Sequence, residues 1–434
     1  MLLVTPLVRL TSKGFEASGD QDVGTNRGRG PSPAPASKWL DHLSAEIDPQ
    51  AVSAACGFFV DTGARDEPST LMGVSHFLEH MAFKGSGELT GEAIDKAFDD
   101  LGLDHNAWTS AEATAFWIHA RPDRLLEGFP ILATLLRPEL RGQDLEDERK
   151  VILEEIAMYE DEPFWVLIEG LLERYYAENG LGHRVLGTNT TVGGITRESM
   201  SSYHTERYGP NNMMLAAAGN LDFQALVDLA ETHAGHWTSA PGRPVRQTPT
   251  QQQVAFEVEK ENLAQQYIVL MMPAPDRKHP KYQAASMLMQ ILGGSESDLL
   301  HWDLVDPGLA EHASASHDMR DGSGEFVCWA VSDPSRAEEV ESRLRLQLEG
   351  LRGNISKDAL SRVRARVATA AALHGELPRG RMSRIGRRWL SHRDWVSIED
   401  EVERIQQVTM EDLHEILDEW SLEPQAVGRL RPAT

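Results

Sequence analysis

The sequence predicts an α+β protein made of two similar domains. Its 434 residues exceed the usual size of a single domain. Strand-like and helix-like segments follow one another in a similar order in the two halves. The short sequence Ile195-Thr196-x-Glu198 also recurs as Val408-Thr409-x-Glu411, 213 positions later. A recurrence at close to half the chain length favours duplication of one unit.

Two segments of biased composition delimit the predicted domains. Residues 1–38 are rich in Gly, Ser, Pro and charge, which predicts a flexible N-terminal extension. A transit peptide is the alternative, because arginines are present, but acidic residues count against it. Residues 239–253 are rich in Pro and Gln and predict a linker. We therefore expect one domain over 39–238 and a second over 254–434.

Hydrophobic periodicity predicts the main elements of both halves. In the first half, we expect a strand over 51–61, a helix from 73 to a stop at Gly85, a helix over 90–101 capped by Thr90, a strand or hairpin over 106–117, and a strand over 208–220 that ends in a Gly-Asn turn. In the second half, we expect strands over 254–260, 267–272 and 324–331, and helices over 281–292, 335–351 and 356–373.

The first of these helices contains the motif His76-x-x-Glu79-His80. Residues four apart on a helix face the same way, so the two imidazoles can hold one Zn²⁺. Glu79 lies beside them, where a carboxylate can act as a base on a water. This order is the inverted form of the zincin motif. Two ordinary histidines, one buried and one solvated, are the alternative interpretation.

A catalytic zinc needs a third protein ligand, and a second helix, predicted over 148–159, offers carboxylates for it. Helical spacing puts Glu148 and Glu155 on one face, whereas Glu154 is rotated by about 100° from its neighbour. A solvated helix face remains the alternative for each of these acids. His183 and His204 show no spacing that relates them to the motif, so we expect them to be structural or surface residues.

Composition excludes several classes of partner and points to a compartment. The net charge of −25 argues against nucleic acid and anionic membranes as partners, and it would favour cationic peptides as substrates. Cys56 and Cys328 lie in apolar runs, which predicts reduced core residues and a cytoplasmic location. No apolar stretch approaches the length of a membrane span.

These motifs together resemble the pitrilysin–insulinase family of zinc peptidases, and most of all its short-chain branch, which includes the mitochondrial processing peptidase and its bacterial homologues. The family carries His-x-x-Glu-His and a distal Glu about 75 residues on, within Glu-Arg-x-x-x-x-x-Glu. Here Glu155 lies 75 positions after His80, and Glu148-Arg149 begins the second segment. The resemblance implies two homologous α+β domains, each a mostly antiparallel sheet packed with helices, with only the first binding zinc.

The resemblance also implies roles for individual residues. His76, His80 and Glu155 would bind one Zn²⁺ per chain, Glu148 would orient a ligand histidine, and Glu79 would be the general base. The segment Asn106-Ala107-Trp108-Thr109 is similar to the family's edge strand, so Asn106 and Ala107 would contact the substrate backbone.

The second half departs from the family pattern at two positions. Family members commonly place an Arg and a Tyr where this chain has Val305 and Glu311, and we do not expect His312 to replace the Tyr. We therefore expect a heterodimer in which a homologous subunit carries the Arg/Tyr pair, with a homodimer as the alternative assembly. The expected function is a zinc endopeptidase acting on short or unfolded peptides. The alternatives are a non-catalytic structural subunit of the same family and a zinc hydrolase acting on a non-peptide bond.

Overall fold

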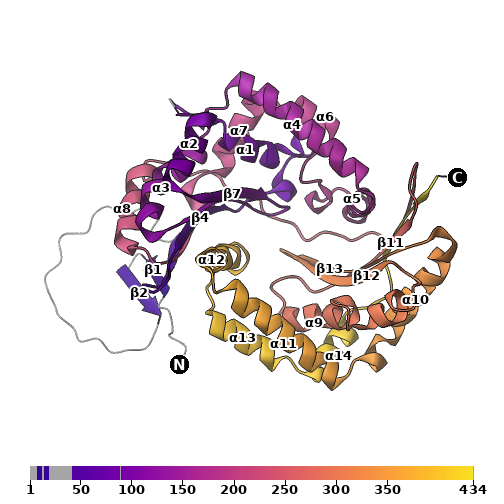
Figure 1. Ribbon diagram of the computed structural model, residues 1–434. Helices are drawn as coiled ribbons and strands as arrows, with labels where there is room; N and C mark the ends of the chain where they lie inside the picture. The colour runs from indigo at the N-terminus through magenta and orange to yellow at the C-terminus, as the bar shows by residue number, and fades with distance from the viewer. Residues whose placement is uncertain (1–6, 12–13, 19–41, 88, 434) are drawn as a thin grey trace. The chain divides into compact units, whose positions relative to one another are not determined.

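The computed structural model describes residues 7–11, 14–18, 42–87 and 89–433. These residues form two compact units, and neither is a continuous piece of chain. The first unit comprises the chain up to Leu153, Val185–Pro244 and Leu373–Trp395. The second comprises Glu154–Arg184, Val245–Ala372 and Val396–Thr434. Each unit contains one large sheet covered by helices, which confirms the predicted α+β class (Figure 1).

The sheet of the first unit has the strand order β2-β1-β3-β9-β4-β8-β7. Strands β3 and β9 are parallel, and all the other pairs are antiparallel. The bounds are Leu7–Thr11 (β1), Gly14–Ser18 (β2), Leu43–Ile47 (β3), Ala54–Val60 (β4), Asp104–Thr109 (β7), Thr114–Ala120 (β8) and Met213–Gly219 (β9). The two-residue strands β5 (Gly85–Ser86) and β6 (Leu89–Thr90) form a separate ribbon.

The sheet of the second unit repeats this order. Its strands run β10-β14-β11-β13-β12, with β10 and β14 parallel and the other pairs antiparallel. In both units the first strand of the repeat lies beside the last, and the third strand ends the sheet. This shared topology supports the duplication inferred from the sequence. The bounds are Val254–Lys260 (β10), Gln266–Pro273 (β11), His312–Arg320 (β12), Ser323–Ser332 (β13) and Ala426–Pro432 (β14).

The helices of the first half follow the predicted periodicity. Thr90 caps α2 by accepting a hydrogen bond from the backbone N–H of Ala93, as predicted. The bounds are Val74–Ala82 (α1), Gly91–Leu101 (α2), Pro122–Leu135 (α3), Gly142–Asp161 (α4), Pro163–Tyr176 (α5), Asn189–Gly194 (α6), Arg197–Arg207 (α7) and Phe223–Ala234 (α8).

The repeated Thr-x-Glu sequence lies at the start of one helix in each half. Thr196 begins α7 and Thr409 begins α14, each through a capping box, and each helix precedes the last strand of its sheet. The recurrence therefore marks equivalent helix starts. The bounds are Tyr282–Gly293 (α9), Ala337–Asn354 (α10), Lys357–His374 (α11), Pro378–His392 (α12), Ile398–Gln407 (α13) and Met410–Glu419 (α14).

One helix from each half packs in the unit built mainly from the other half (Figure 1). Helix α5 packs on β10, β11 and β14, where its side chains join a buried cluster with Val269 and Met271. Helix α12 packs on β3, β4 and β9, where Met382, Ile385 and Trp389 complete a cluster with Phe59. The predicted boundaries at 39–238 and 254–434 describe sequence repeats and stay a prediction. The compact units differ from these repeats, because α5 belongs to the second unit and α12 to the first.

The predicted N-terminal extension is corrected in part. Residues 7–11 and 14–18 form β1 and β2, and β1 pairs with β3. The rest of the predicted extension, apart from these ten residues, lies outside the described residues.

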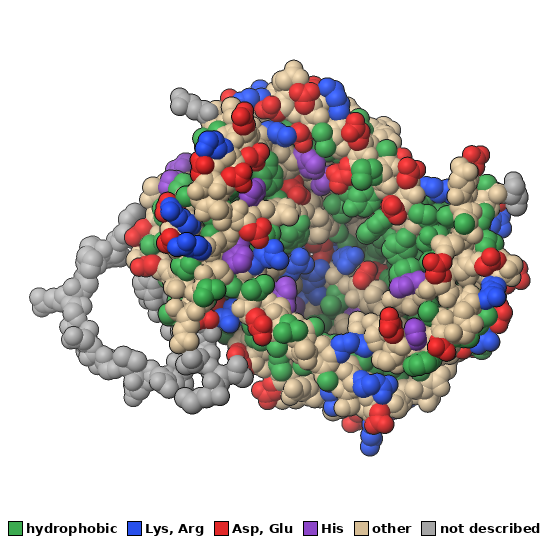
Figure 2. Space-filling model, viewed as in Figure 1, with side chains coloured by type: hydrophobic (Ala, Val, Ile, Leu, Met, Phe, Trp, Pro, Cys, Tyr) green, Lys and Arg blue, Asp and Glu red, His purple; other side chains and the backbone are tan. Residues whose placement is uncertain are grey.

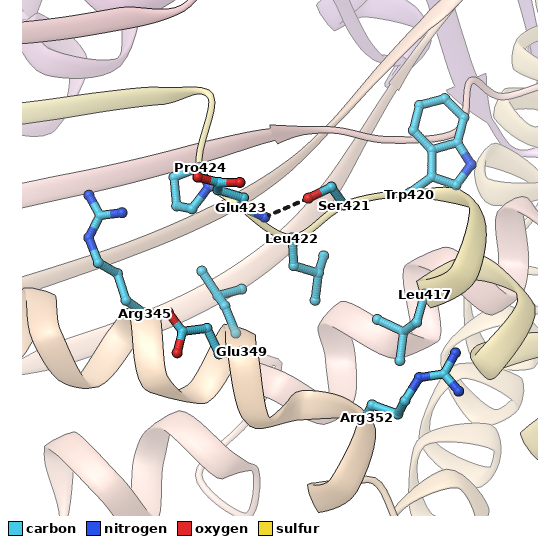
Figure 3. A pocket seen from close by; sticks show the side chains of 10 residues that line it. Arg345, Glu349, Arg352, Leu417, Trp420, Ser421, Leu422, Glu423 and Pro424 are labelled. Carbon is cyan, nitrogen blue, oxygen red and sulfur yellow. Dashed lines mark hydrogen bonds between the residues drawn. The ribbon is translucent and has the colours of Figure 1, made fainter.

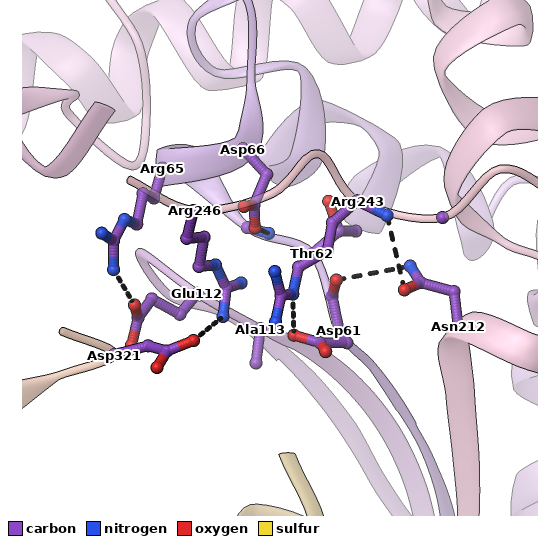
Figure 4. A network of polar contacts seen from close by, with 12 residues as sticks. Asp61, Thr62, Arg65, Asp66, Glu112, Ala113, Asn212, Arg243, Arg246 and Asp321 are labelled. Atoms are coloured by element: carbon purple, nitrogen blue, oxygen red, sulfur yellow. Dashed lines mark hydrogen bonds and ion pairs between the residues drawn. The ribbon is translucent and has the colours of Figure 1, made fainter. Parts of the chain in front are cut away.

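The segment predicted as a linker is held by polar contacts along its length. The Arg243 guanidinium lies 2.9 Å from Asp61, the residue after β4 (Figure 4). Asp61 also pairs with Arg393, the residue after α12. Further along, Arg246 lies 4.0 Å from Asp321 within the second unit. Asp61 is almost fully buried, so a paired cation is needed to offset the cost of burying its charge.

Both cysteines are core residues, as predicted. Cys56 and Cys328 are buried and form no disulfide. Burial raises the pKa of both thiols, to about 12 for Cys328. No helix in the described part of the chain is long and apolar enough to span a membrane.

Candidate metal centre and active site

Helix α1 is anchored at its N-terminus by a buried carboxylate. Gly73 is the N-cap, with φ of +94°, a left-handed conformation that favours glycine. The Glu67 carboxylate accepts hydrogen bonds of 2.7 Å from the backbone N–H groups of both Gly73 and Ser75. Burial raises the pKa of Glu67 to about 8, against the lowering effect of these bonds. The predicted helix stop at Gly85 is wrong, because α1 ends at Ala82 and Gly85 begins β5.

The structure brings the three predicted ligands together. One donor atom from each of His76, His80 and Glu155 lies within 4.8 Å of the others, and no other such group occurs in the described part of the chain. The two imidazoles come from one face of α1, with ring centroids 4.7 Å apart. Two imidazoles and a carboxylate form a donor set that zinc takes in catalytic sites. The residues present therefore fit a zinc ion with a position left open for substrate.

Glu155 and Glu148 lie on α4, which is one continuous helix. Glu154 is exposed and Glu155 is half-buried, as the predicted helical phase requires. Helical geometry thus presents Glu155 toward the histidines and turns Glu154 toward solvent.

Glu148 connects His80 to a cation. One of its carboxylate oxygens lies 3.0 Å from Nδ1 of His80, and the other lies 2.5 Å from Nζ of Lys84. A carboxylate at Nδ1 favours the tautomer with the proton on that nitrogen, which leaves the Nε2 lone pair available to a metal. Glu148 is buried, so this contact is only weakly screened by solvent.

Glu79 is held by the edge strand of the sheet. The Thr109 hydroxyl of β7 donates a hydrogen bond of 2.5 Å to Oε2 of Glu79. Helix α1 and β7 pack against each other, so the ligand helix and the sheet edge share one site. The bond fixes the direction of the carboxylate beside the two histidines.

Strand β7 ends the sheet of the first unit, so one side of its backbone has no partner strand within the described residues. Asn106 and Ala107 lie in the middle of this strand. The backbone N–H of Ala107 donates to the side chain of Asn106 at 2.8 Å. The two predicted substrate-contact residues therefore lie at an exposed sheet edge, on the strand that holds Glu79.

Burial sets the protonation of the innermost histidine. His76 is largely buried, and its burial, assisted by the neighbouring His80, lowers the pKa to about 3. A neutral imidazole is the form that binds a metal. His76 is therefore neutral near pH 7, and a ring-nitrogen lone pair is available to a metal.

Other predicted residues lie away from this group. His204 is half-buried, with Nε2 2.9 Å from the carbonyl oxygen of Leu136, and His183 is not in the ligand cluster. In the second unit, Glu311 is exposed and accepts a hydrogen bond from Gln265. His312 stacks on Trp329, with centroids 4.4 Å apart.

Sequence reasoning missed three residues of the site: Glu67, Lys84 and Thr109. Glu67 could have been identified as an acidic residue shortly before a helix start, where a carboxylate is favourable. Lys84 lies four residues after His80, but a single lysine near a helix end does not indicate a role in a metal site. Thr109 belongs to the quoted edge-strand segment, yet only packing reveals that its hydroxyl meets Glu79.

The second unit has a separate pocket of about 500 Å³ between α10 and the segment that follows α14 (Figure 3). It is lined by Arg345, Glu349, Arg352 and Trp420, among others. Its two arginines are engaged within the unit, since Arg345 pairs with Glu341 and Arg352 with Asp418. None of the predicted ligands or substrate-contact residues lines it, so it gives no support for a second active site.

Comparison with known families divides the chain in two. Residues 43–189 match the family described as "Insulinase (Peptidase family M16)", and residues 194–367 match "Peptidase M16 inactive domain". The ligands, Glu79 and Glu148 all lie within the first match. Val305 and Glu311 lie within the second match.

Similar proteins cover most of the chain. A protein of Mycobacterium bovis, named an uncharacterized zinc protease, is 31% identical over 383 residues, which are 86% of each chain. The probable mitochondrial-processing peptidase subunit beta of Schizosaccharomyces pombe is 28% identical over 302 residues, 67% of this chain and 64% of that one. The crystal structure of a protease from Helicobacter pylori has a TM-score of 0.84 at 21% identity, and covers 90% of this chain and 97% of that one.

Proposed function

Because the chain belongs to the M16, or insulinase, family of peptidases, we propose that it is a zinc-dependent endopeptidase that cleaves short or unfolded peptides. The observation that carries the proposal is the position of Glu79. Its carboxylate stands beside the group formed by His76, His80 and Glu155, and the Thr109 hydroxyl fixes its direction. A non-catalytic subunit would have no use for this arrangement.

Each residue of the site has a separate role in the proposed reaction. Zinc held by His76, His80 and Glu155 would supply a Lewis acid that polarises the scissile carbonyl and acidifies a water. Glu79 takes a proton from the attacking water and passes it to the leaving amine. Thr109 positions Glu79 for both transfers, and Glu148 holds His80 in the tautomer that leaves Nε2 free for the metal.

The exposed edge of β7 binds the substrate. An extended peptide would add to the sheet as a further strand, with main-chain hydrogen bonds to the outward backbone groups around Ala107. The Asn106 side chain, which accepts a hydrogen bond from the Ala107 N–H, would rotate away to contact the peptide. Such pairing needs an extended chain and little sequence, which fits short or unfolded peptides rather than folded proteins.

The chain would act as the zinc-bearing subunit of a heterodimer. Val305 and Glu311 provide no guanidinium or phenol, and a carboxylate near a developing oxyanion would oppose catalysis. The partner would be a homologous chain that carries the Arg/Tyr pair in its second domain, and a homodimer is the second possibility. The buried free thiols and the acidic composition support a cytoplasmic protein without nucleic-acid or membrane partners.

Zinc content and peptide cleavage, measured together, test the proposal. Glu79→Gln should retain zinc and lose cleavage, because the amide keeps the shape but cannot take the proton. His80→Ala should lose both. The purified chain should cleave poorly, and addition of the homologous partner should raise its rate. Equal turnover by Glu79→Gln and the parent would refute the general base, and a fully active homodimer would refute the heterodimer.

A further inference from the structure

The two faces of β7 meet different surroundings. His105 and Thr109 face the helices of the active site: His105 stacks on Phe98 of α2, and Thr109 bonds to Glu79 of α1. Trp108 points to the opposite face, where its ring lies 6.3 Å from that of Phe59, in the cluster covered by α12. Side chains alternate along a strand, so any peptide added to this edge would also distribute its side chains between these two faces.

The arginines of α12 differ in their partners. All but one form an ion pair with an acidic residue of the same unit: Arg379 with Asp104 at 3.5 Å, Arg381 with Asp48 at 3.3 Å, Arg384 with Glu46, and Arg388 with Asp394 at 2.6 Å. Within the described residues, Arg387 has no such carboxylate. Its guanidinium lies 4.5 Å from the ring centroid of Trp108, and its Nε donates to the Ser383 hydroxyl at 3.3 Å.

The Arg387 guanidinium is therefore positioned by an aromatic ring, and partial desolvation lowers its pKa. The residue is exposed, while the half-buried indole of Trp108 fixes the plane of the guanidinium by a cation–π contact. An arginine stacked in this way keeps its N–H groups available to a carboxylate and has less side-chain entropy to lose on binding. Trp108 belongs to the edge strand and is next in sequence to Thr109, the residue that holds Glu79.

The hairpin geometry shows which backbone groups face the open edge. The Ser110 N–H donates to the Ala113 carbonyl at 2.8 Å and closes the turn between β7 and β8. In an antiparallel pair, alternate residues bond to the partner strand, so Trp108 bonds inward while Ala107 and Thr109 direct their N–H and C=O groups outward. A peptide bound to these outward groups would run past Trp108 within a few residues of Glu79.

From these contacts we propose that Trp108 and Arg387 form a subsite for an acidic side chain of the substrate, on the α12 face of the peptide bound to β7. The inference rests on the proposed peptidase function and names a specificity of that same site. An aspartate or glutamate at this position would pair with the guanidinium and pack its methylene groups on the indole.

This preference is local and runs against the charge of the whole chain. The net charge of −25 would repel acidic peptides in general. Acidic and basic side chains are nevertheless interspersed over the face shown in Figure 2. An acidic residue should therefore help only in one register, on the face of Trp108, and should hinder on the face of Glu79.

A peptide series with one moving charge tests the subsite. A single Glu is moved residue by residue through an otherwise uncharged peptide, cleavage sites are located by mass spectrometry, and kcat/KM is measured for each peptide. We expect Glu to improve cleavage by about threefold at one position and to give no gain at its two neighbours. The same peptides are titrated into the Glu79→Gln variant by fluorescence anisotropy, which measures binding without turnover.

Matched variants identify the residue responsible. Arg387→Gln should abolish the positional preference, and Arg387→Glu should reverse it in favour of Lys at the same position. Arg388→Gln removes an equal charge from the next residue and should leave the preference intact. Melting temperature and zinc content confirm that each variant is folded.

The outcomes separate the subsite from the peptidase function. If the parent cleaves the peptides but shows no positional preference, or if the preference survives in Arg387→Glu, the subsite is refuted and the peptidase function stands. If no peptide is cleaved, with or without the homologous partner, but Glu79→Gln binds them with the expected preference, hydrolysis fails and the subsite is supported. If the peptides are neither cleaved nor bound, both proposals fail.

Discussion

Replacement of Glu148 by Gln would test whether this buried carboxylate sets the affinity of the site for zinc. The parent carboxylate lies 3.0 Å from Nδ1 of His80 and 2.5 Å from Nζ of Lys84. Glutamine keeps an acceptor for His80 but removes the negative charge that makes its imidazole a stronger ligand. Loss of such a partner typically weakens metal binding about 10- to 100-fold, or about 1.4–2.7 kcal/mol. Solvent can compensate Lys84, whose side chain is 38% exposed.

Competition with a chromophoric chelator at fixed pH and ionic strength would measure the zinc Kd of each variant. Glu146→Gln is the matched control, because Glu146 lies on the same helix, is exposed, and pairs only with Arg149 among the ion pairs of the described residues. We expect the control to bind zinc as the parent does. If Glu148→Gln, folded as judged by circular dichroism, binds zinc within about twofold of the parent, Glu148 does not act through His80.

Four further predictions test individual contacts. Glu155→Gln should weaken zinc binding, whereas Glu154→Gln should not, and the reverse result would contradict the helical phase. Thr109→Val removes the hydroxyl that holds the general base, so kcat should fall about tenfold at unchanged zinc content, and an unchanged kcat would exclude a positioning role. Gly73→Ala, at φ of +94°, should cost about 2 kcal/mol of stability by calorimetry, and an unchanged melting temperature would show that the backbone relaxes. Burial lowers the pKa of His204 to about 4 from the usual 6.5, so the unfolded chain takes up the proton first and stability falls as the pH drops between these values. His204→Gln should make the melting temperature depend less on pH over that range, and an unchanged profile would contradict this linkage.

The residues proposed as metal ligands could be identified because part of their arrangement is local. His76 and His80 lie one turn apart on any helix, and the same periodicity distinguishes Glu155 from Glu154. The stop of α1 was misplaced at Gly85, because its φ of +109° serves the short β5–β6 ribbon rather than the helix end. A glycine in the sequence indicates a left-handed backbone position, but it does not show which turn requires that conformation.

One repeated helix-start sequence indicated the duplication, and the shared strand order of the two sheets gives the stronger support for it. Thr196 and Thr409 look like any helix caps in the sequence. Their equivalence becomes clear only when both sheets place the first strand beside the last. Local capping chemistry is encoded in a few residues, whereas strand order depends on which distant segments pair.

From the sequence alone we could predict the residues of the proposed centre: helical spacing joins His76, Glu79 and His80, and the family resemblance adds Glu155. Tertiary packing alone decided that Thr109 holds Glu79, that α5 and α12 each pack in the unit built mainly from the other half, and that Arg387 lies over Trp108 instead of a carboxylate. The physical reason is the range of the interactions. Side chains three or four residues apart meet on every helix, but a hydroxyl and a carboxylate 30 positions apart, or an arginine and an indole 279 apart, meet only where the packed sheet and helices bring them together.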